Sequence, residues 1–427
     1  MKRSYFFAHI TKEPPADETS VNAQLLVRGA FVDKLMAGVY SYLPLGLRVL
    51  RKIENIVREE MDAIGGQEVL MAMLHPKTIW EQTGGWGSID VLFKIQSRTE
   101  KEYALGQSEE EVVTPLVLSR MHTYKDFPLA VYQIHWKFRD ELRAKSGLLR
   151  GREFLMKDMY SFHRDQVDFE RFYTIAKQAY FRVYSRLGLT AKATEASGGS
   201  FSTKISYEFM VLTDAGEDDI LYCDTCEFCV NKEIAKEKEG EKCTRCGKGA
   251  LHMARASEVG NVFDLGQKYG KDFNLGYTDE KGEKQYPIMG CYGIGISRLL
   301  GVVVEKFNDA RGIRWPAAIA PFQVNLIVLL SKDSNESARI SVAAETLYHS
   351  LRSAGIDVLF DDREHISAGE KFAEADLIGA PWRVVVSAKT LAGEFAELKA
   401  RDSENAELIS LSKILNTLAE AIKKSTV

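Results

Sequence analysis

The chain has 427 residues, of which 45% are hydrophobic and 27% charged, and its formal net charge is −4. These values are typical of a globular protein with two or three domains, and they exclude a surface that is basic all over. A local basic stripe would still suffice to bind nucleic-acid phosphates. No apolar run approaches the length that crosses a bilayer, and residues 1–10 lack the apolar core of a secretory signal. We therefore expect a cytoplasmic protein with no membrane partner and no DNA partner.

The first part of the chain predicts helices combined with antiparallel strands. Apolar residues recur at helical spacing over 46–62, which predicts an amphipathic helix. Two semi-apolar runs, 132–139 and 154–162, flank a polar segment at 140–152 and predict an antiparallel hairpin. The other elements expected here are a strand at 67–74, a helix at 167–187 ended by Gly188, strands at 259–265 and 286–289, and a buried helix at 294–304.

Residues 222–250 interrupt this pattern, because they are rich in Cys, Lys, Glu and Gly and cannot bury much of a core by themselves. Two Cys-x2-Cys pairs, Cys223 with Cys226 and Cys243 with Cys246, are separated by sixteen residues, which fits a four-cysteine zinc ribbon. Four thiolates leave no open position on the metal, so we predict a structural Zn²⁺. Cys229 could replace Cys226, and free cysteines on a loop are the alternative.

A second domain begins near 314–322, where two prolines interrupt the pattern. Beyond this boundary, strands and helices alternate, which predicts a small α/β domain with a largely buried sheet. The expected elements are strands at 324–330, 358–360 and 383–386 and helices at 338–352 and 371–378.

Two separated segments carry groups suited to a nucleotide. In the first, Arg139 and Glu141 precede the polar loop, and Arg152 and Phe154 follow it. The planar fork of arginine matches phosphate and carboxylate oxygens, and an aromatic ring can cover a base. A charged surface hairpin is the alternative.

The second segment is the glycine-rich stretch 290–298, which predicts a strand-to-helix turn. Its glycines allow the backbone to approach a flat ligand, and Arg298, just inside the helix, could reach a phosphate tail or stack on a ring. The stretch lacks the third glycine of the dinucleotide fingerprint and the Gly-Lys-Ser/Thr of a Walker loop. A glycine-packed helix start is the alternative.

Together these segments resemble motifs 2 and 3 of the class II aminoacyl-tRNA synthetases, and specifically the prolyl-tRNA synthetases of the bacterial type. The resemblance runs over nearly the whole chain, through 43–46, 49–61, 106–113, 138–141, 152–158, 160–163, 258–260, 289–298 and 361–363. It implies an α+β fold, with an antiparallel sheet flanked by helices, a C-terminal α/β anticodon-binding domain and a small Cys-rich, zinc-ribbon-like insert. The implied parts are a catalytic domain at 1–221 (motifs 1 and 2) and 255–315 (motif 3), the insert at 222–254 and the anticodon-binding domain at 316–427.

The resemblance implies a ligase that activates L-proline with ATP to prolyl-adenylate and transfers the prolyl group to tRNA(Pro). In this reading Arg139 contacts the α-phosphate and the substrate carboxylate, and Arg152 and Arg298 hold the bent triphosphate tail. Arg139 and Arg298 are thus the implied catalytic residues, and Mg²⁺ is expected to bridge the phosphates. The ATP-binding residues implied are Arg139, Glu141, Arg152, Phe154, Glu208 and Arg298, with Glu208 or a nearby carboxylate as a metal ligand.

Proline recognition is implied for a second set: Ser108, Glu110, Arg139, Phe162, His163 and Cys291. Ser108 stands where the family has threonine, and Glu110 would pair with the proline ammonium. For the three consecutive carboxylates at 109–111 the alternative is a solvated helix start. For Cys291 the alternative is a buried, inert cysteine.

Other expectations follow from the same resemblance. The family forms homodimers through motif 1. Many bacterial members carry a large editing insertion between motifs 2 and 3, and the stretch 208–289 is too short for it. We therefore predict slow alanyl-tRNA formation that this chain does not clear. Candidates for local tRNA contacts are Asp361, Arg363, Lys371, Trp382 and Arg383, each with a solvated surface role as the alternative.

The alternative functions are another class II synthetase, threonyl or glycyl, or a non-catalytic synthetase paralogue. A paralogue should have lost arginines from the two motifs, and Arg139, Arg152 and Arg298 are all present.

Overall fold

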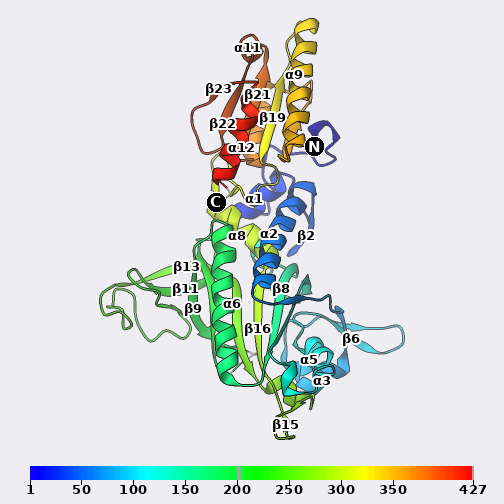
Figure 1. The fold of residues 1–427 in the computed structure, drawn as a ribbon, viewed down its shortest axis with the longest axis vertical. Coiled ribbons are helices and arrows are strands. Elements are labelled where there is room, and N and C mark those ends of the chain that lie inside the picture. Colours follow the sequence, from blue (N-terminus) through cyan, green and yellow to red (C-terminus); the bar gives the residue numbers. More distant parts are fainter. Residues whose placement is uncertain (200–201, 203, 426–427) are drawn as a thin grey trace. The chain divides into compact units, whose positions relative to one another are not determined.

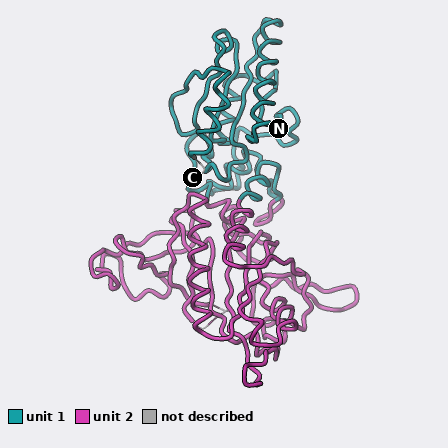
Figure 2. Tube along the Cα trace, in the orientation of Figure 1, with its two compact units in different colours: residues 1–34, 41–52, 303–427 teal, residues 35–40, 53–302 magenta. Residues whose placement is uncertain are grey.

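The computed structural model describes residues 1–199, 202 and 204–425. The chain forms two compact units: unit 1 comprises 1–34, 41–52 and 303–427, and unit 2 comprises 35–40 and 53–302 (Figure 2). Four elements include residues of both units: β1 (Val32–Met36), β2 (Val39–Tyr42), α2 (Pro44–Ala63) and α8 (Ile296–Lys306). The helix predicted at 46–62 is confirmed as α2, and its apolar stripe, Val49, Ile53, Val57 and Met61, is fully buried.

Unit 2 is built on a nine-stranded sheet with the order β10-β9-β12-β11-β13-β16-β8-β7-β3. Neighbouring strands are antiparallel, apart from the short parallel pairings of β12 with β9 and of β3 with β7. Its strands are β3 (Gln67–Glu68), β7 (Leu129–Phe138), β8 (Glu153–His163), β9 (Ala191–Ser197), β10 (Ile205–Leu212), β11 (Asp218–Cys223), β12 (Cys229–Asn231), β13 (Leu251–Gly266) and β16 (Ile288–Gly295). The hairpin predicted around 140–152 is confirmed, with Lys137 opposite Phe154 and Leu129 opposite Phe162.

The two faces of this sheet have different surroundings. Helix α6 (Gln166–Arg186), predicted at 167–187, runs along the sheet (Figure 1) and covers one face. Lys157 of β8 donates to the Tyr180 hydroxyl of α6 at 2.6 Å. Side chains alternate along a strand, so the even-numbered residues of β8, from Phe154 to Phe162, belong to the opposite face. That second face carries the site described below.

The glycine-rich segment corrects one prediction. Residues 290–295 are not a turn but the body of β16, and α8 begins only at Ile296. Strand β16 pairs with β8 on one side and β13 on the other, so two ladders of backbone hydrogen bonds outweigh the low strand preference of glycine. Close packing requires some of these glycines, because a Cβ on Gly290 would lie 2.4 Å from the Tyr292 hydroxyl oxygen. The strand expected at 286–289 therefore starts later, at Ile288, and is longer.

The strand predicted at 67–74 is also wrong in part. The segment contains only β3 and the first residue of β4 (Leu74–Pro76), which belong to different sheets. Between them the chain leaves the ladder, because the Met71 N–H donates to the side chain of Gln133. The other elements of unit 2 are α3 (Lys77–Thr83), α4 (Gly85–Ser88), β5 (Lys94–Gln96), β6 (Glu102–Leu105), α5 (Glu110–Leu118), η2 (Tyr124–Asp126), η3 (Gly147–Leu149), α7 (Lys268–Asp272), β14 (Tyr277–Thr278) and β15 (Lys284–Gln285).

Unit 1 contains a five-stranded sheet with the order β20-β19-β21-β22-β23, in which the first three strands are parallel. The predicted strands and helices are confirmed as β19 (Val324–Leu329), β20 (Val358–Asp361), β21 (Trp382–Ser387), α9 (Ser334–Ser353) and α10 (Ala368–Ile378). Elements that were not predicted are η1 (Arg3–Tyr5), α1 (Val21–Arg28), β17 (Asn308–Asp309), β18 (Gly312–Ile313), α11 (Ala388–Leu391), β22 (Phe395–Ala400), β23 (Glu407–Ser410) and α12 (Ile414–Ser425).

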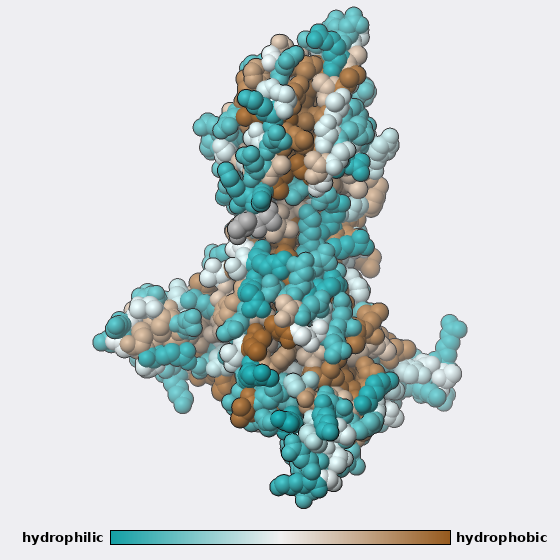
Figure 3. Space-filling view, in the orientation of Figure 1, coloured by the Kyte–Doolittle hydropathy of each residue, from teal (hydrophilic) through white to brown (hydrophobic). Residues whose placement is uncertain are grey.

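Hydrophilic side chains surround scattered hydrophobic patches on the face of each unit drawn in Figure 3. Among the described residues, no helix combines the length and apolarity that spanning a membrane requires.

Candidate active site

A cavity opens on the face of the unit 2 sheet that α6 does not cover. It encloses about 550 Å³, part of it open to solvent. Because Gly293 and Gly295 carry no side chain, the floor along β16 is backbone. Other lining residues are Arg139, Glu141, Leu148, Leu149, Arg150, Gly151, Phe154, Met156, Glu258, Val259, Gly260, Asn261 and Arg298.

Arg139 enters the cavity directly after β7. Its guanidinium lies 5.2 Å from the centre of the Phe154 ring, and Nη2 donates to the Gln107 carbonyl oxygen at 3.4 Å. Its buried Nε has no hydrogen-bond partner among the described residues. Burial and, secondarily, the charge of Arg298 lower the pKa of Arg139. Such a cation is suited to an anionic group that would enter the cavity.

Arg298 reaches the same cavity from the first turn of α8. Its Nε donates to the Leu149 carbonyl oxygen and its Nη1 to the Glu258 carbonyl oxygen, both at 2.7 Å. Three elements thus hold one guanidinium in place: α8 through its backbone, the loop before β8, and β13.

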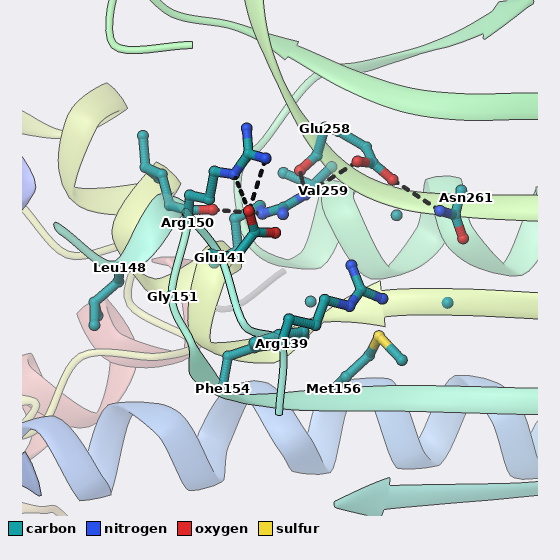
Figure 4. A pocket seen from close by; sticks show the side chains of 15 residues that line it. Arg139, Glu141, Leu148, Arg150, Gly151, Phe154, Met156, Glu258, Val259 and Asn261 are labelled. Atoms are coloured by element: carbon teal, nitrogen blue, oxygen red, sulfur yellow. Dashed lines mark hydrogen bonds and ion pairs between the residues drawn. The ribbon is translucent and has the colours of Figure 1, made fainter. Parts of the chain in front are cut away.

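Arg150 also lines the cavity, and the sequence analysis did not select it. Its Nη2 lies 2.8 Å from a Glu141 carboxylate oxygen (Figure 4). Its Nη1 lies 2.9 Å from Glu217. Arg152 is not among the lining residues. Its guanidinium donates to the carbonyl oxygens of Glu141 and Ala37, both at 3.0 Å. The only indication in the sequence is position: Arg150 stands four residues before Phe154 and three residues before β8 begins.

Carboxylates gather beside the arginines, where an adjoining cavity is lined by Glu141, Glu217, Asp218 and Glu258. Burial and the Glu258 charge raise the pKa of Asp218 to about 6. The same causes raise the pKa of Glu208, on β10, to about 8. Glu208 is not a lining residue, and it accepts a 3.3 Å hydrogen bond from Asn231. Glu217 and Asp218 were not among the predicted site residues, although both stand in an acidic run, 217–219.

The three consecutive carboxylates at 109–111 are buried, so they are not a solvated helix start. Glu110 is 0% exposed, and neither of its carboxylate oxygens has a hydrogen-bond partner among the described residues. Burial raises the pKa of Glu110, and the neighbouring Ser108 hydroxyl and Cys291 thiol oppose the rise only in part. Cys291 stands opposite Tyr160 in the register of β16 and β8, on the face of the cavity. The structure therefore brings Ser108, Glu110 and Cys291 together.

Phe162 and His163 are not brought together. They are adjacent in β8, so their side chains project from opposite faces of the sheet. Phe162 belongs to the core on the cavity face, with Cys291 and Tyr160. His163 Nδ1 lies 2.6 Å from Asp168 of α6, and its ring packs against Phe169 and Phe172. The imidazole is thus part of the opposite face.

The four predicted metal ligands form one cluster at the end of the β11–β13 ribbon. Their sulfurs all lie within 4.8 Å of one another, and the Cys223–Cys246 and Cys226–Cys243 separations are both 3.7 Å. Four sulfurs at about 2.3 Å from a tetrahedral Zn²⁺ would be about 3.8 Å apart, so the cluster fits this ion. Cys229 lies elsewhere, with its sulfur 3.1 Å from the Thr194 hydroxyl.

The charged tRNA candidates in unit 1 are engaged within the unit. Lys371 is 2% exposed and donates to the Val328 carbonyl oxygen at 2.8 Å. Arg363 pairs with Asp361 and Glu374, and Arg383 lies 3.7 Å from both Asp376 and Glu397. Trp382 is partly buried against the core of the sheet.

Comparisons with known proteins agree with this geometry. Residues 93–307 match the family described as "tRNA synthetase class II core domain (G, H, P, S and T)", and residues 323–421 match the "Anticodon binding domain". Together with the antiparallel sheet and its arginine-lined cavity, these matches define a class II aminoacyl-tRNA synthetase. The expectation of this fold, with a C-terminal anticodon-binding domain, is confirmed.

Similar proteins of known name identify the family within this class. The proline–tRNA ligase of Legionella pneumophila (strain Philadelphia 1) is 32% identical, and the match covers 99% of this chain and all of the relative. That of Acidithiobacillus ferrooxidans is 31% identical over 98% of this chain and 99% of the relative. The chain belongs to the proline–tRNA ligase family, as the sequence analysis predicted. A prolyl-tRNA synthetase structure from Cryptosporidium parvum, "complexed with Halofuginone and AMPPNP", shares the fold with a TM-score of 0.77 at 18% identity, covering 95% of this chain and 77% of that one.

The length of the Legionella match is informative. It extends over 573 positions, whereas this chain has 427 residues, so at least 146 positions have no counterpart here.

Proposed function

We propose that this chain activates L-proline with ATP in the arginine-lined cavity and then transfers the prolyl group to tRNA(Pro). One observation carries the proposal: Arg139, Arg150 and Arg298 converge on one cavity, and a buried carboxylate close enough to act on the charge of Arg139, that of Glu110, has no hydrogen-bond partner among the described residues. The relatives' names, proline–tRNA ligase, supply the amino acid and the reaction.

The first step is an in-line displacement at phosphorus. A proline carboxylate oxygen forms a bond to the α-phosphorus of ATP, the bond to the bridging oxygen breaks, and pyrophosphate leaves with that electron pair. Negative charge spreads over the phosphoryl oxygens, where fixed guanidinium donors stabilise it. Arg139 has free donor capacity for the α-phosphate and for the proline carboxylate. The protein thereby contributes positioning and charge stabilisation rather than acid–base chemistry.

The rest of the cavity binds the nucleotide. Phe154, under Arg139, offers a ring face to adenine, and Glu141 orients the ATP end together with Arg150. Arg298 and Arg150 hold the triphosphate tail, and Arg152 supports the hairpin through its contacts with the carbonyl oxygens of Glu141 and Ala37. The Cryptosporidium neighbour holds AMPPNP, an analogue of ATP, which supports a nucleotide site in this fold.

The carboxylates beside the arginines suit Mg²⁺. Asp218, Glu258 and Glu208 crowd together with raised pKa values on two of them, and hard oxygen ligands are the ones that Mg²⁺ prefers. These residues would hold the ion, which would neutralise phosphate charge, while the arginines orient the phosphates.

Proline is recognised next to Arg139. Its secondary ammonium pairs with Glu110, which then gains the partner that it lacks, and Ser108 adds a hydroxyl. Cys291 and Phe162 supply small and flat apolar walls on the same face. His163 acts from the opposite face, where it fixes the end of β8 against Asp168.

The four-cysteine cluster holds a structural Zn²⁺. Six buried residues form a separate core around it: Leu221, Cys223, Phe228, Val230, Cys243 and Leu251. So small a core is insufficient alone, and metal binding supplies the remaining folding energy. Because the ligands are thiolates, the protein belongs in a reducing compartment, which agrees with the cytoplasm.

A homodimer fits the exposed apolar side chains of the motif 1 region. Leu70, on the segment that joins β3 to β4, is 73% exposed, and Leu74, the first residue of β4, is 55% exposed. Large apolar side chains this exposed are typical of an interaction surface. Sedimentation at micromolar concentration, compared with a Leu70→Glu variant, tests this assembly.

The decisive experiment is ATP–pyrophosphate exchange with each of the twenty amino acids. Proline should drive exchange strongly and alanine weakly, and charging should require tRNA(Pro). A preference for threonine or glycine would contradict the proposal, and a lack of exchange with every amino acid would indicate the non-catalytic paralogue.

A further inference from the structure

Four titratable side chains that the adenylation step does not use are buried together: that of Glu109, within the segment 107–111, and three that pack beneath this segment. They are His75 of β4, Glu109, Lys137 of β7 and Asp158 of β8, and none is more than 1% exposed. Charges this deeply buried are costly unless they are paired, so their arrangement requires an explanation.

Two ion pairs and one histidine contact connect the four groups in series. Lys137 Nζ lies 2.9 Å from Asp158 Oδ1 and 3.6 Å from Glu109 Oε1. His75 Nε2 lies 3.0 Å from Glu109 Oε2 and 2.9 Å from the Ala72 carbonyl oxygen. Because a carbonyl oxygen can only accept, Nε2 carries the hydrogen. The network therefore ties the small β4-β6-β5 sheet to the nine-stranded sheet.

Tyr160 connects this network to the proposed proline residues. Its hydroxyl accepts from the Glu109 N–H at 2.8 Å, donates to Asp158 Oδ2 at 3.0 Å and lies 3.3 Å from Ser108 Oγ. Gln133 donates to the same Asp158 oxygen at 3.2 Å. Asp158 thus fixes the tyrosine that holds the backbone of Glu109 and the hydroxyl of Ser108.

The packing around Glu109 leaves little freedom. A Cβ on Gly106 would lie 2.4 Å from Glu109 Oε1 and 3.0 Å from His75 Cε1. Any displacement of the segment would separate Glu109 from Lys137 and His75 and leave a buried charge without its partner, which is far more costly than the net gain from pairing. The segment is therefore held in one arrangement from beneath.

We infer that His75, Glu109, Lys137 and Asp158 are positioning residues that set the affinity for proline by fixing Ser108 and Glu110, without acting on ATP. The inference rests on the proposed role of Glu110. None of the four lines the ATP cavity, whereas Ser108, next to Glu109 in the chain, contacts Tyr160 of the network directly. Loss of the network should thus affect the two substrates unequally.

Glu109→Gln tests this, because it preserves shape and removes the charge. In ATP–pyrophosphate exchange the KM for proline should rise about tenfold, the KM for ATP should change less than about twofold, and kcat should change little; tenfold is about 1.4 kcal/mol of binding. The matched control is Glu102→Gln in β6, an exposed residue of the same small sheet that pairs with Lys77. Both KM values should be unchanged in this control.

Charge rebalancing provides a second readout. Lys137→Met alone should lower the melting temperature markedly, because Glu109 and Asp158 both lose their cation. Adding Glu109→Gln to that variant should recover part of the loss, since one buried charge disappears. Additive losses in the double variant would overturn the network.

Glu110→Gln distinguishes a failure of the positioning role from a failure of the proline pocket. If it raises the KM for proline while Glu109→Gln leaves both KM values unchanged or raises both equally, the positioning inference is wrong and the proline pocket stands. If Glu110→Gln leaves the KM for proline unchanged, the pocket itself is wrong, and the inference falls with it.

Discussion

The Arg298 guanidinium donates through Nη1 to the main-chain carbonyl oxygen of Glu258 at 2.7 Å and lies 3.2 Å from the Glu258 carboxylate. The first contact fixes the direction of the cation, and the second places a carboxylate beside it. Fixed donors of this kind stabilise a transition state without reorganising. The pair thus joins motif 3, through α8, to the strand β13 that crosses the centre of the sheet.

Arg298→Ala should lower the rate of proline-dependent ATP–pyrophosphate exchange by about 10²–10³-fold, the usual effect of removing one fixed donor from a transition state. Arg298→Lys should recover little, because lysine lacks the planar fork. The exchange rate under saturating ATP and proline is the measurement. Arg171→Ala, on the exposed side of α6 with a side chain 70% accessible, is the control. An Arg298→Ala enzyme with undiminished exchange would contradict the assignment.

Substitutions of Arg150 and Arg152 should affect different properties: the KM for ATP and the stability of the fold, respectively. Arg150→Ala should raise the KM for ATP about tenfold or more, since the variant loses a charge-assisted contact to the phosphate tail. Arg152→Ala should instead lower the stability by about 1 kcal/mol, the net value of a typical hydrogen bond, because its guanidinium supports two backbone carbonyl oxygens. Steady-state kinetics and urea unfolding of both variants are the measurements. The reverse pattern would restore Arg152 as the nucleotide ligand.

The purified protein should contain about one Zn²⁺ per chain, as expected for a four-thiolate site. Cys243→Ser should reduce the zinc content and lower the melting temperature, because the small core around the cluster depends on the metal. Cys229→Ser is the matched control, since its sulfur contacts Thr194 outside the cluster. Elemental analysis and thermal unfolding decide the question, and a metal-free, stable wild-type protein would disprove the site.

Glu111 should make stability depend on pH. Burial and the neighbouring Glu110 raise the pKa of Glu111 to about 8, so the folded state keeps a proton that the unfolded state has released above pH 4.5. Stability must therefore fall as pH rises from about 4.5 to 8, by at most about 1.4 kcal/mol per pH unit. Glu111→Gln removes this slope, so its advantage over the wild type should grow with pH.

Urea midpoints at pH 5, 6.5 and 8 measure this difference. Glu170→Gln, an exposed position on α6, serves as the control and should follow the wild type at each pH. A constant difference between Glu111→Gln and the wild type across the three pH values would show that Glu111 is ionised throughout.

Alanine should be activated and should remain on the tRNA. A proline pocket gains only about 1–3 kcal/mol from each extra methylene, so alanine is excluded by a modest factor. The Legionella match contains at least 146 positions without a counterpart in this chain, and the stretch 208–289 offers no room for an editing domain. Deacylation of alanyl-tRNA(Pro) by the pure protein should match the spontaneous rate. Rapid hydrolysis would reveal a clearing activity in the chain.

The periodicity of the sequence predicted five of the helices, α2, α6, α8, α9 and α10, and the central hairpin, because local hydrophobic patterns dictate them. It failed where pairing partners decide the outcome. The glycines of β16 looked like a turn, and they became a strand because β8 and β13 bond to both of its edges. The segment 67–74 looked like one strand, yet Gln133 captures the Met71 N–H and divides it.

The structure likewise brings together only some of the predicted site residues. Resemblance selected Arg139, Glu141, Phe154 and Arg298, which the structure brings to one cavity. It also grouped Phe162 with His163, although the alternation of side chains in a strand places adjacent residues on opposite faces. Arg150, Glu217 and Asp218 were overlooked. Their places near Phe154 and in an acidic run were visible, but one sequence does not tell which charged residues face a cavity.

The sequence by itself determined which chemistry this chain can perform, since motif residues, cysteine spacing and hydrophobic period are written in local order. Only the tertiary structure decided which of those residues meet. Glu109, Glu110 and Glu111, for which a solvated helix start was the alternative, lie in the interior. The physical reason is that desolvation and ion pairing depend on distances between strands far apart in the chain, and those distances exist only after the sheet has formed.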